Sequence, residues 1–218
     1  MSACRQCPRL VAYRERVARD KRRAFREWDY WGKPVPGFGA ADACLLVIGL
    51  APAAHGGNRT GRIFTGDRSG DWLYGTLHRF GFANQPGSTH RADGLQLPRA
   101  YVTAAVHCAP PDNKPTHQEF QNCQPYLERE LQLLTQVRVV VPLGRVAFDA
   151  YLSARRTVGQ TVPRPRPRFA HAECVDLGDV TLIGSYHPSQ RNTQTGFLTQ
   201  AMFDRVFATA RQLVDKHP

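Results

Sequence analysis

The sequence lacks the features that define several large classes of protein. Its apolar runs, of which ACLLVIGL at 43–50 is an example, stay well short of the roughly 18 residues that a membrane-spanning helix needs. The first ten residues, MSACRQCPRL, contain no apolar stretch of the kind found in secretory signals. No internal repeat is evident. We therefore expect a cytosolic protein that does not associate with membranes.

Acidic residues are scarce relative to basic ones. The 218 residues include 29 Lys and Arg but only 18 Asp and Glu, which gives a formal net charge of +11. Such an excess is typical of proteins that bind polyanions. A solvated charged face is the alternative, and composition alone does not exclude it. Clustering favours nucleic acid as the partner, because the basic residues gather in two stretches: Arg14, Arg16, Arg19, Lys21, Arg22, Arg23 and Arg26, then Arg164, Arg166 and Arg168.

The length suits a single domain over 1–218 with one substantial core. Apolar and amphipathic segments alternate along the chain, which predicts an α/β fold with a mostly parallel sheet. Residues 1–40 form an N-terminal helix and a Pro/Gly-rich loop in this interpretation. We expect strands at 43–50, 100–106, 137–143 and 180–185, and helices at 4–28, 71–82, 116–134, 145–154 and 198–214.

The six cysteines do not resemble a disulfide framework, because no secretory signal accompanies them. Cys4 and Cys7 form a C-x-x-C pair, a spacing that lets two thiolates reach one metal centre. Cys108 and Cys123 add two thiols, and four thiolates can hold either zinc or a [4Fe–4S] cluster. Two cysteines remain, Cys44 in the first apolar run and Cys174 after a loop, and we interpret both as incidental.

The loop GLAPAAHGGNRTGRIFTGD at 49–67 follows the first predicted strand and contains five glycines. It matches neither the phosphate-binding P-loop nor the dinucleotide-binding G-x-G-x-x-G pattern, which argues against a nucleotide cofactor. Phe64 is an aromatic residue in an otherwise polar stretch, and Asp67 stands at the start of the next helix. An Asp in that position is most often a helix cap.

Two more polar segments follow strands. CAPPDNKP at 108–115 places Asn113 in a Pro-rich turn, where Asn is usually a turn former. YHPSQRNTQTG at 186–196 places His187 at a strand end, followed by side chains that can bond phosphate oxygens. Ligands bind at the carboxyl ends of parallel strands, so the three segments should converge. An aromatic ring, an amide, a carboxylate and an imidazole in a basic protein suit a flipped nucleobase.

Three segments, GLAPAAHGGNRTGRIFTGD, TAAVHCAPPDNKPT and YHPSQRNTQTG, together resemble family-five uracil-DNA glycosylases, the type B iron–sulfur branch of that superfamily. The match runs from Cys4 to the last predicted helix. The resemblance implies a three-layer α/β/α sandwich around a four-stranded parallel sheet. It also implies a [4Fe–4S] cluster bound by Cys4, Cys7, Cys108 and Cys123, which makes a zinc site the weaker hypothesis.

The resemblance also implies roles for individual residues. Asp67 aligns with the catalytic carboxylate of the family, and His187 would donate to the negative charge that develops on the base or hold the adjacent phosphate. Phe64 would stack on the flipped base, and Asn113 would bond its Watson–Crick edge. The remaining assignments are a pocket wall at Ala51, Pro52 and Ala53, and DNA contacts from Ser189, Gln190, Arg191 and Asn192.

The implied activity is hydrolysis of the N-glycosidic bond of uracil in DNA, with hypoxanthine and other deaminated bases as further substrates. The first motif lacks the nearby Glu of family four, and 103–105 read Thr-Ala-Ala where that family has Thr-Asn, which predicts a looser pocket. Ala53 stands where relatives often have Gly, and its methyl group would narrow the pocket. Lys114 is the only lysine near the motifs, so we expect a monofunctional enzyme, acting as a monomer.

Two alternatives stay open at this point. A non-catalytic iron–sulfur module that binds nucleic acid or senses redox state would show salt-dependent DNA binding without base release. A zinc protein would use the same four cysteines but would lack visible colour.

Overall fold

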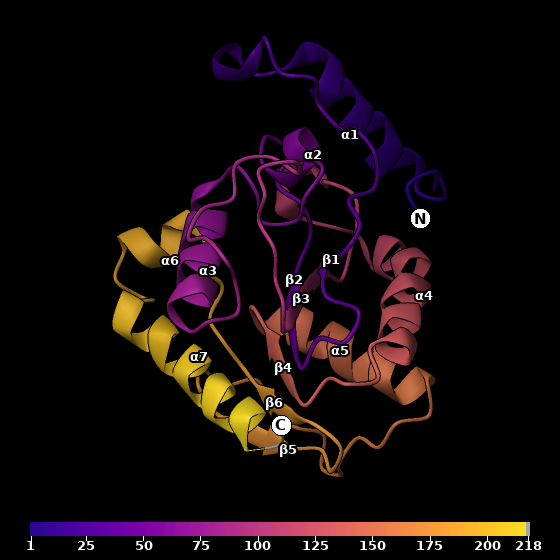
Figure 1. Ribbon diagram of the computed structural model, residues 1–218. Helices are drawn as coiled ribbons and strands as arrows, with labels where there is room; N and C mark the ends of the chain where they lie inside the picture. Colours follow the sequence, from indigo (N-terminus) through magenta and orange to yellow (C-terminus); the bar gives the residue numbers. More distant parts are fainter. Residues whose placement is uncertain (217–218) are drawn as a thin grey trace.

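A six-stranded mixed sheet forms the centre of the computed structural model, which describes residues 1–216 (Figure 1). The strand order is β1-β3-β2-β4-β6-β5. The four inner strands are parallel, and the two edge strands run antiparallel to their neighbours. The strands are β1 (Phe38–Gly39), β2 (Leu45–Gly49), β3 (Ala100–Ala104), β4 (Val139–Pro142), β5 (Cys174–Asp176) and β6 (Thr181–Ile183).

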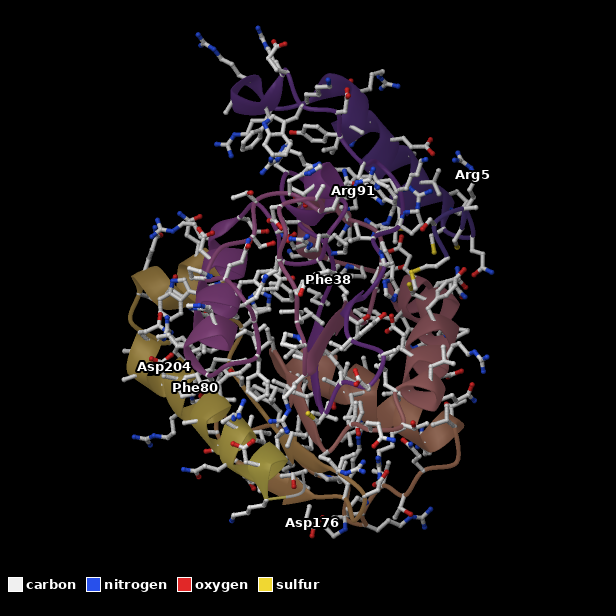
Figure 2. The ribbon with its side chains drawn as sticks, in the orientation of Figure 1. Arg5, Phe38, Phe80, Arg91, Asp176 and Asp204 are labelled. Carbon is white, nitrogen blue, oxygen red and sulfur yellow. The ribbon has the colours of Figure 1, made fainter. Side chains whose placement is uncertain are left out.

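Helices cover both faces of the sheet, as the sequence predicts. In Figure 1, α3 and α7 lie on one side of the strands, and α4 and α5 lie on the other. Asp204 on α7 accepts a 2.6 Å hydrogen bond from Arg79 on α3, close to the Asp204 label in Figure 2. The α-helices are α1 (Pro8–Asp20), α2 (Gly57–Thr60), α3 (Arg68–Arg79), α4 (His117–Leu133), α5 (Arg145–Thr157), α6 (Gln190–Gln194) and α7 (Gln200–Asp215).

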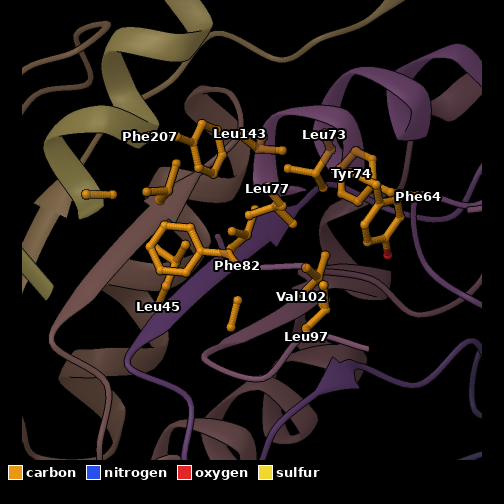
Figure 3. Close-up of a cluster of buried hydrophobic side chains, with 14 of the residues drawn as sticks. Leu45, Phe64, Leu73, Tyr74, Leu77, Phe82, Leu97, Val102, Leu143 and Phe207 are labelled. Carbon is orange, nitrogen blue, oxygen red and sulfur yellow. The ribbon is translucent and has the colours of Figure 1, made fainter. Parts of the chain in front are cut away.

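The strand β2 shows why this sequence forms a buried parallel sheet. Successive side chains of a strand point to opposite faces, and here both faces are covered. Leu45 and Val47 pack into the core on the side of α3 and α7, which Figure 3 shows in part. Leu46 and Ile48 pack into the core on the side of α4 and α5. The continuous apolar run therefore serves two cores, and the three-layer α/β/α prediction is confirmed.

The N-terminal helix is shorter than expected. The sequence predicts one helix over 4–28, but α1 ends at Asp20, because Lys21 adopts a left-handed φ of 50°. A 3₁₀ turn, Arg23–Phe25, follows. The edge strands β1 and β5 and the helices α2 and α6 were not predicted, since segments of two to five residues carry too little periodic pattern to stand out.

One basic residue counted with the N-terminal cationic stretch is not on the surface. Arg14 is 2% exposed and faces the interior beneath α1. The clustering of positive charge at 14–26 therefore overstates the cationic surface. Within residues 1–216, helices long and apolar enough to cross a membrane are absent.

Candidate active site and cysteine cavity

The candidate active site lies at the carboxyl edge of the parallel strands. The loop after β2 carries Phe64 and Asp67, and the segment after β6 carries His187. Because β2, β4 and β6 run parallel as neighbours, their carboxyl ends meet at one edge. The structure thus brings together two of the three segments that the sequence predicts to converge, those at 49–67 and 186–196.

Phe64 and His187 are in contact. Their ring centroids lie 5.7 Å apart, with the planes inclined by 32°. Phe64 is 8% exposed and belongs to the main hydrophobic core, where Figure 3 shows it beside Tyr74. The ring lies over the last residue of β2, so that a Cβ on Gly49 would meet two ring atoms at 2.6 and 2.7 Å. Gly49 is therefore required for the aromatic ring to occupy this position.

Asp67 is both the N-cap of α3 and a candidate catalyst. Its Oδ1 accepts a 3.0 Å hydrogen bond from the backbone N–H of Gly70. The other oxygen, Oδ2, lies against the Cα of Gly56, where a side chain would collide with it. Burial raises the pKa of Asp67, and the N–H groups of Gly70 and Ser69 oppose that rise. One oxygen is thus fixed by the helix, while the second faces the Gly-rich loop.

His187 is held as a neutral imidazole. Burial lowers its pKa to about 4. In the part of the chain that the structure describes, its ring nitrogens make no hydrogen bond, whereas its backbone carbonyl accepts one of 2.9 Å from Asn192 Nδ2. A neutral imidazole offers one N–H donor and one acceptor nitrogen. The ring is therefore free to donate one hydrogen bond to an incoming group.

The predicted DNA-contacting residues divide into two kinds. Ser189 caps α6 by accepting from the backbone N–H of Asn192 at 3.3 Å. The Asn192 side chain is already bonded to the His187 carbonyl, so these two residues hold the loop together. Gln190 and Arg191 are exposed. DNA contact by all four residues stays a prediction.

The predicted pocket wall is built tightly. Pro52 is buried, and Ala51 and Ala53 are partly buried. The carbonyl of Ala53 accepts hydrogen bonds from the backbone N–H groups of Gly56 and Asn58. The Ala53 methyl group lies 3.2 Å from the position that a Cβ on Gly56 would occupy, which places it on the side of Gly56 that Asp67 also approaches.

Asn113 stands apart from this packed group. It ends a 3₁₀ turn, Pro111–Asn113, with a left-handed φ of 55°, and its side chain is exposed. The carboxamide has no hydrogen-bond partner among residues 1–216. The backbone of Asn113 thus forms a turn, as expected for an Asn in a Pro-rich segment. The role of its side chain in recognising a base stays a prediction.

The four thiols predicted to bind a metal group line one narrow cavity. Cys4 and Cys7 precede α1, Cys108 follows β3, and Cys123 lies in α4. Cys44 is bonded to the carbonyl of Arg99, and Cys174 is exposed in β5. The structure therefore separates the four candidate ligands from the two incidental cysteines, as the sequence predicts.

Hydrogen-bond donors surround the cavity sulfurs. Arg14 Nη1 donates to Cys108 Sγ at 2.8 Å, and Asn122 Nδ2 donates to Cys7 Sγ at 3.4 Å. The backbone N–H of His107 donates to Cys123 Sγ at 3.3 Å. Burial raises the pKa of Cys108, and it raises that of Cys123 to about 12. Thiolates would need compensating positive charge here, which a bound metal group and Arg14 can supply.

The donor set of the cavity bears on the kind of metal group that it could hold. In the described part of the chain, no three Cys, His, Asp or Glu side chains lie close enough to hold a single metal ion. Four thiols line the cavity, and four thiolates can bind either zinc or a [4Fe–4S] cluster. The chemistry of the donors is therefore compatible with the cluster that the resemblance implies.

Two functional candidates were missed by sequence reasoning. Arg14 was counted as a surface cation, although it contacts a candidate ligand sulfur. Arg59 is 4% exposed, and its guanidinium lies in the corner formed by the rings of Phe25 and Trp28. Only the tertiary fold brings these residues together, so no local pattern could have identified them.

The fold and these residues define an α/β protein with an aromatic, imidazole and carboxylate site at the carboxyl edge of its sheet. The family model described as the uracil DNA glycosylase superfamily matches residues 36–211 of this chain. The chain belongs to the uracil DNA glycosylase superfamily.

Individual relatives define the match more closely. A Type-5 uracil-DNA glycosylase of Mycobacterium leprae is 53% identical over 215 residues, which cover 98% of this chain and 92% of the relative. One from Thermus thermophilus is 50% identical over 214 residues, covering 98% and 94%. A Type-4 uracil-DNA glycosylase of Sulfurisphaera tokodaii is 29% identical over 163 residues, covering 74% and 67%.

Proposed function

We propose that this chain is a monofunctional DNA glycosylase, which hydrolyses the N-glycosidic bond of uracil in DNA and leaves an abasic site for base excision repair. The observation that carries the proposal is the grouping of Phe64, His187 and Asp67 at one sheet edge in a member of this superfamily. Relatives about 50% identical over nearly the whole chain are uracil-DNA glycosylases.

Binding begins with the uracil nucleotide rotated out of the duplex, because the target bond is inaccessible inside it. The flipped base stacks on Phe64, whose ring is fixed over Gly49. Ala51, Pro52 and Ala53 bound the base, and Asn113 turns inward to bond its edge. The excess of basic residues, 29 against 18 acidic ones, attracts the DNA backbone.

Bond cleavage produces positive charge on the sugar and negative charge on the base. Neutral His187 donates a hydrogen bond to the oxygen of the departing base, where the negative charge develops. The Asp67 carboxylate faces the sugar, stabilises its positive charge and orients the attacking water. Burial raises the pKa of Asp67, so proton abstraction from water is easier than for an ordinary Asp.

A duplex with one uracil, incubated with the protein and then treated with alkali, tests this function. Strand breaks after alkali are expected at the uracil, because alkali cleaves abasic sites. Strand breaks without alkali would contradict the monofunctional mechanism, and intact DNA after alkali would contradict the glycosylase itself. A duplex with hypoxanthine tests the second substrate that we propose.

We also propose that Cys4, Cys7, Cys108 and Cys123 bind a [4Fe–4S] cluster. Their shared cavity and the N–H groups that donate to three of the four sulfurs support the proposal. When bound, the cluster supplies four iron–sulfur bonds, which tie the segment before α1 to β3 and α4. Purified protein should absorb visible light and contain about four iron atoms per chain. We propose that the enzyme acts as a monomer, which sedimentation can test.

A further inference from the structure

A buried arginine lies next to the candidate catalytic loop without forming a salt bridge. Arg59 is the third residue of α2 and is 4% exposed. Within residues 1–216, no carboxylate forms an ion pair with its guanidinium, although the charges of Arg59 and Asp67 attract each other from a greater distance. Burying a cation without a directly bonded counter-ion is unfavourable, so other contacts must hold the guanidinium in place.

Two aromatic rings, whose planes are inclined by 80°, contact the Arg59 guanidinium from two sides. Its Cζ lies 3.9 Å from the centroid of the Phe25 ring and 4.1 Å from that of Trp28. Both rings come from the segment that follows α1, which reaches across α2 at the upper end of Figure 1. The backbone N–H of Trp31 also donates to the Arg59 carbonyl at 2.9 Å. Cation–π contacts hold a planar guanidinium in a fixed plane.

The same guanidinium donates hydrogen bonds to two backbone carbonyls of the Gly-rich loop, one before α2 and one after it. Arg59 Nε donates to the carbonyl of His55 at 2.7 Å, and Nη2 donates to the carbonyl of Gly66 at 3.0 Å. A Cβ on Gly66 would collide with the guanidinium, so this approach requires glycine. Two donors in different directions within one rigid plane are a property of arginine and not of lysine.

The Gly66 carbonyl belongs to the peptide group that joins Gly66 to Asp67. Because that group is planar, fixing its oxygen also fixes the backbone nitrogen of Asp67. Asp67 begins α3 with a φ of −144°, and its side chain direction depends on this entry angle. The guanidinium thereby restrains the carboxylate without touching it.

We propose that Arg59 is a positioning residue for base release. Packed against Phe25 and Trp28, it orients the Gly66–Asp67 peptide, and the segment after α1 thus affects the rate of the chemical step. This inference rests on the proposed glycosylase function, with Asp67 as its catalyst. It gives the aromatic segment a role in the reaction that is separate from DNA affinity.

The test compares Arg59→Ala and Arg59→Lys with the unaltered chain under single-turnover conditions on a uracil duplex. Both variants should release uracil on the order of 10- to 100-fold more slowly, since small misplacements of a catalytic group have effects of this size. Affinity is measured on a duplex carrying 2′-fluoro-2′-deoxyuridine, which resists hydrolysis. It should change by less than about twofold, because the buried Arg59 side chain offers almost no surface for contact with DNA.

Chemical rescue separates positioning from general stability. In Arg59→Ala, free guanidinium chloride at about 20 mM should enter between Phe25 and Trp28 and restore part of the rate. Sodium chloride at the same concentration should not. The matched control is Arg155→Ala, because Arg155 is similarly buried at 1% exposure but pairs with Asp179 in the turn before β6, at the amino edge of the parallel strands. That variant should lose thermal stability and keep its rate of base release.

Several outcomes would overturn the inference. They are an unchanged rate in both Arg59 variants, an equal loss of rate in Arg155→Ala, rescue by sodium chloride as well as guanidinium, or a loss that appears in affinity alone. If the unaltered chain releases no uracil, the proposed function fails at the first measurement. An active chain whose Arg59 variants match it leaves the function standing and removes only the positioning role.

Discussion

The ring of His187 packs against the ring of Phe64, with 5.7 Å between centroids, and Phe64 in turn covers the backbone of Gly49. Three separate parts of the chain therefore meet in one contact: the end of β2, the loop after it and the segment after β6.

Gly49→Ala should act like Phe64→Ala, because a methyl group at 49 would meet the Phe64 ring at 2.6 Å and displace it. Stacking of a base on an aromatic ring contributes about 1–3 kcal/mol, so kcat/KM on a uracil duplex should fall on the order of 10- to 100-fold in both variants. Gly87→Ala is the control, since a Cβ there meets nothing within 4 Å. Full activity in Gly49→Ala would contradict the stacking role.

Asp67→Asn should separate catalysis from helix capping. Asn is as good an N-cap as Asp, so the bond from the Gly70 N–H is retained and the melting temperature should change little. The rate of uracil release should fall by at least about 100-fold, because the charge that stabilises the sugar cation is lost. Affinity for uracil DNA should be kept. Asp67→Ala should in addition lose about 1 kcal/mol of stability. A fully active Asp67→Asn would show that the carboxylate is only a cap.

Activity should fall at acidic pH and not at moderately alkaline pH. The proposed mechanism needs ionised Asp67 and neutral His187, and both groups gain a proton as the pH falls. Burial raises the pKa of Asp67 and lowers that of His187 to about 4, so the rate should fall as the pH drops into the range where these two groups gain protons. Single-turnover rates from pH 4 to 9 measure this profile. A rate that rises towards acidic pH would contradict these protonation states.

His187 also links stability to pH. An unfolded chain protonates this His near pH 6.5, whereas in the folded protein its pKa is about 4. Between these values the unfolded state binds more protons, so the His187 contribution to the free energy of unfolding should diminish as the pH falls from about 6.5 to 4. Urea denaturation of the unaltered chain and of His187→Gln at pH 7.5 and 5 measures the difference, which should be smaller in the variant.

Replacing a cavity cysteine should remove colour, and replacing an outlying cysteine should not. Cys108→Ala and Cys7→Ala each delete one thiol of the cavity, so visible absorbance and iron content should fall sharply. Cys174→Ser changes an exposed residue in β5 and should keep both. Loss of iron from Cys174→Ser alone would contradict the assignment of ligands.

Ala53→Gly should widen the range of bases. The Ala53 methyl group lies close to Gly56, on the side that Asp67 also approaches. Its removal should raise kcat/KM for hypoxanthine relative to uracil, because purines need more room. A panel of duplexes with uracil, hypoxanthine, xanthine and thymine measures this ratio. An unchanged ratio would place the size limit of the pocket elsewhere.

The buried elements could be predicted from sequence because their patterns are local. The apolar run at 43–50 indicates a strand covered on both faces, and β2 has one core on each side. Thr116 and Glu119 form a capping box at the start of α4, close to the predicted boundary. The edge strands β1 and β5 depend on pairing with distant segments, and their own two or three residues could not reveal it.

The site could be predicted only as a set of residue types. Phe64 and His187 were expected to lie near one another, because their loops follow parallel strands, and they do. The sequence could not show that Asp67 caps α3 with one oxygen and directs the other towards the Gly-rich loop. That arrangement depends on the three-dimensional fold. The same holds for Arg14 and Arg59, whose burial follows from the way the segment around α1 folds back over the sheet edge.

The cap at the start of α3 restricts the Asp67 side chain before any substrate binds. A surface aspartate samples several rotamers, and ordering it when substrate binds would cost on the order of 0.5–1 kcal/mol. The Asp67 side chain has already lost that freedom on folding, because the Gly70 N–H holds one of its oxygens. The entropy cost of ordering Asp67 is therefore offset during folding, when α3 forms and packs on α7. Substrate binding does not have to restrict this side chain again.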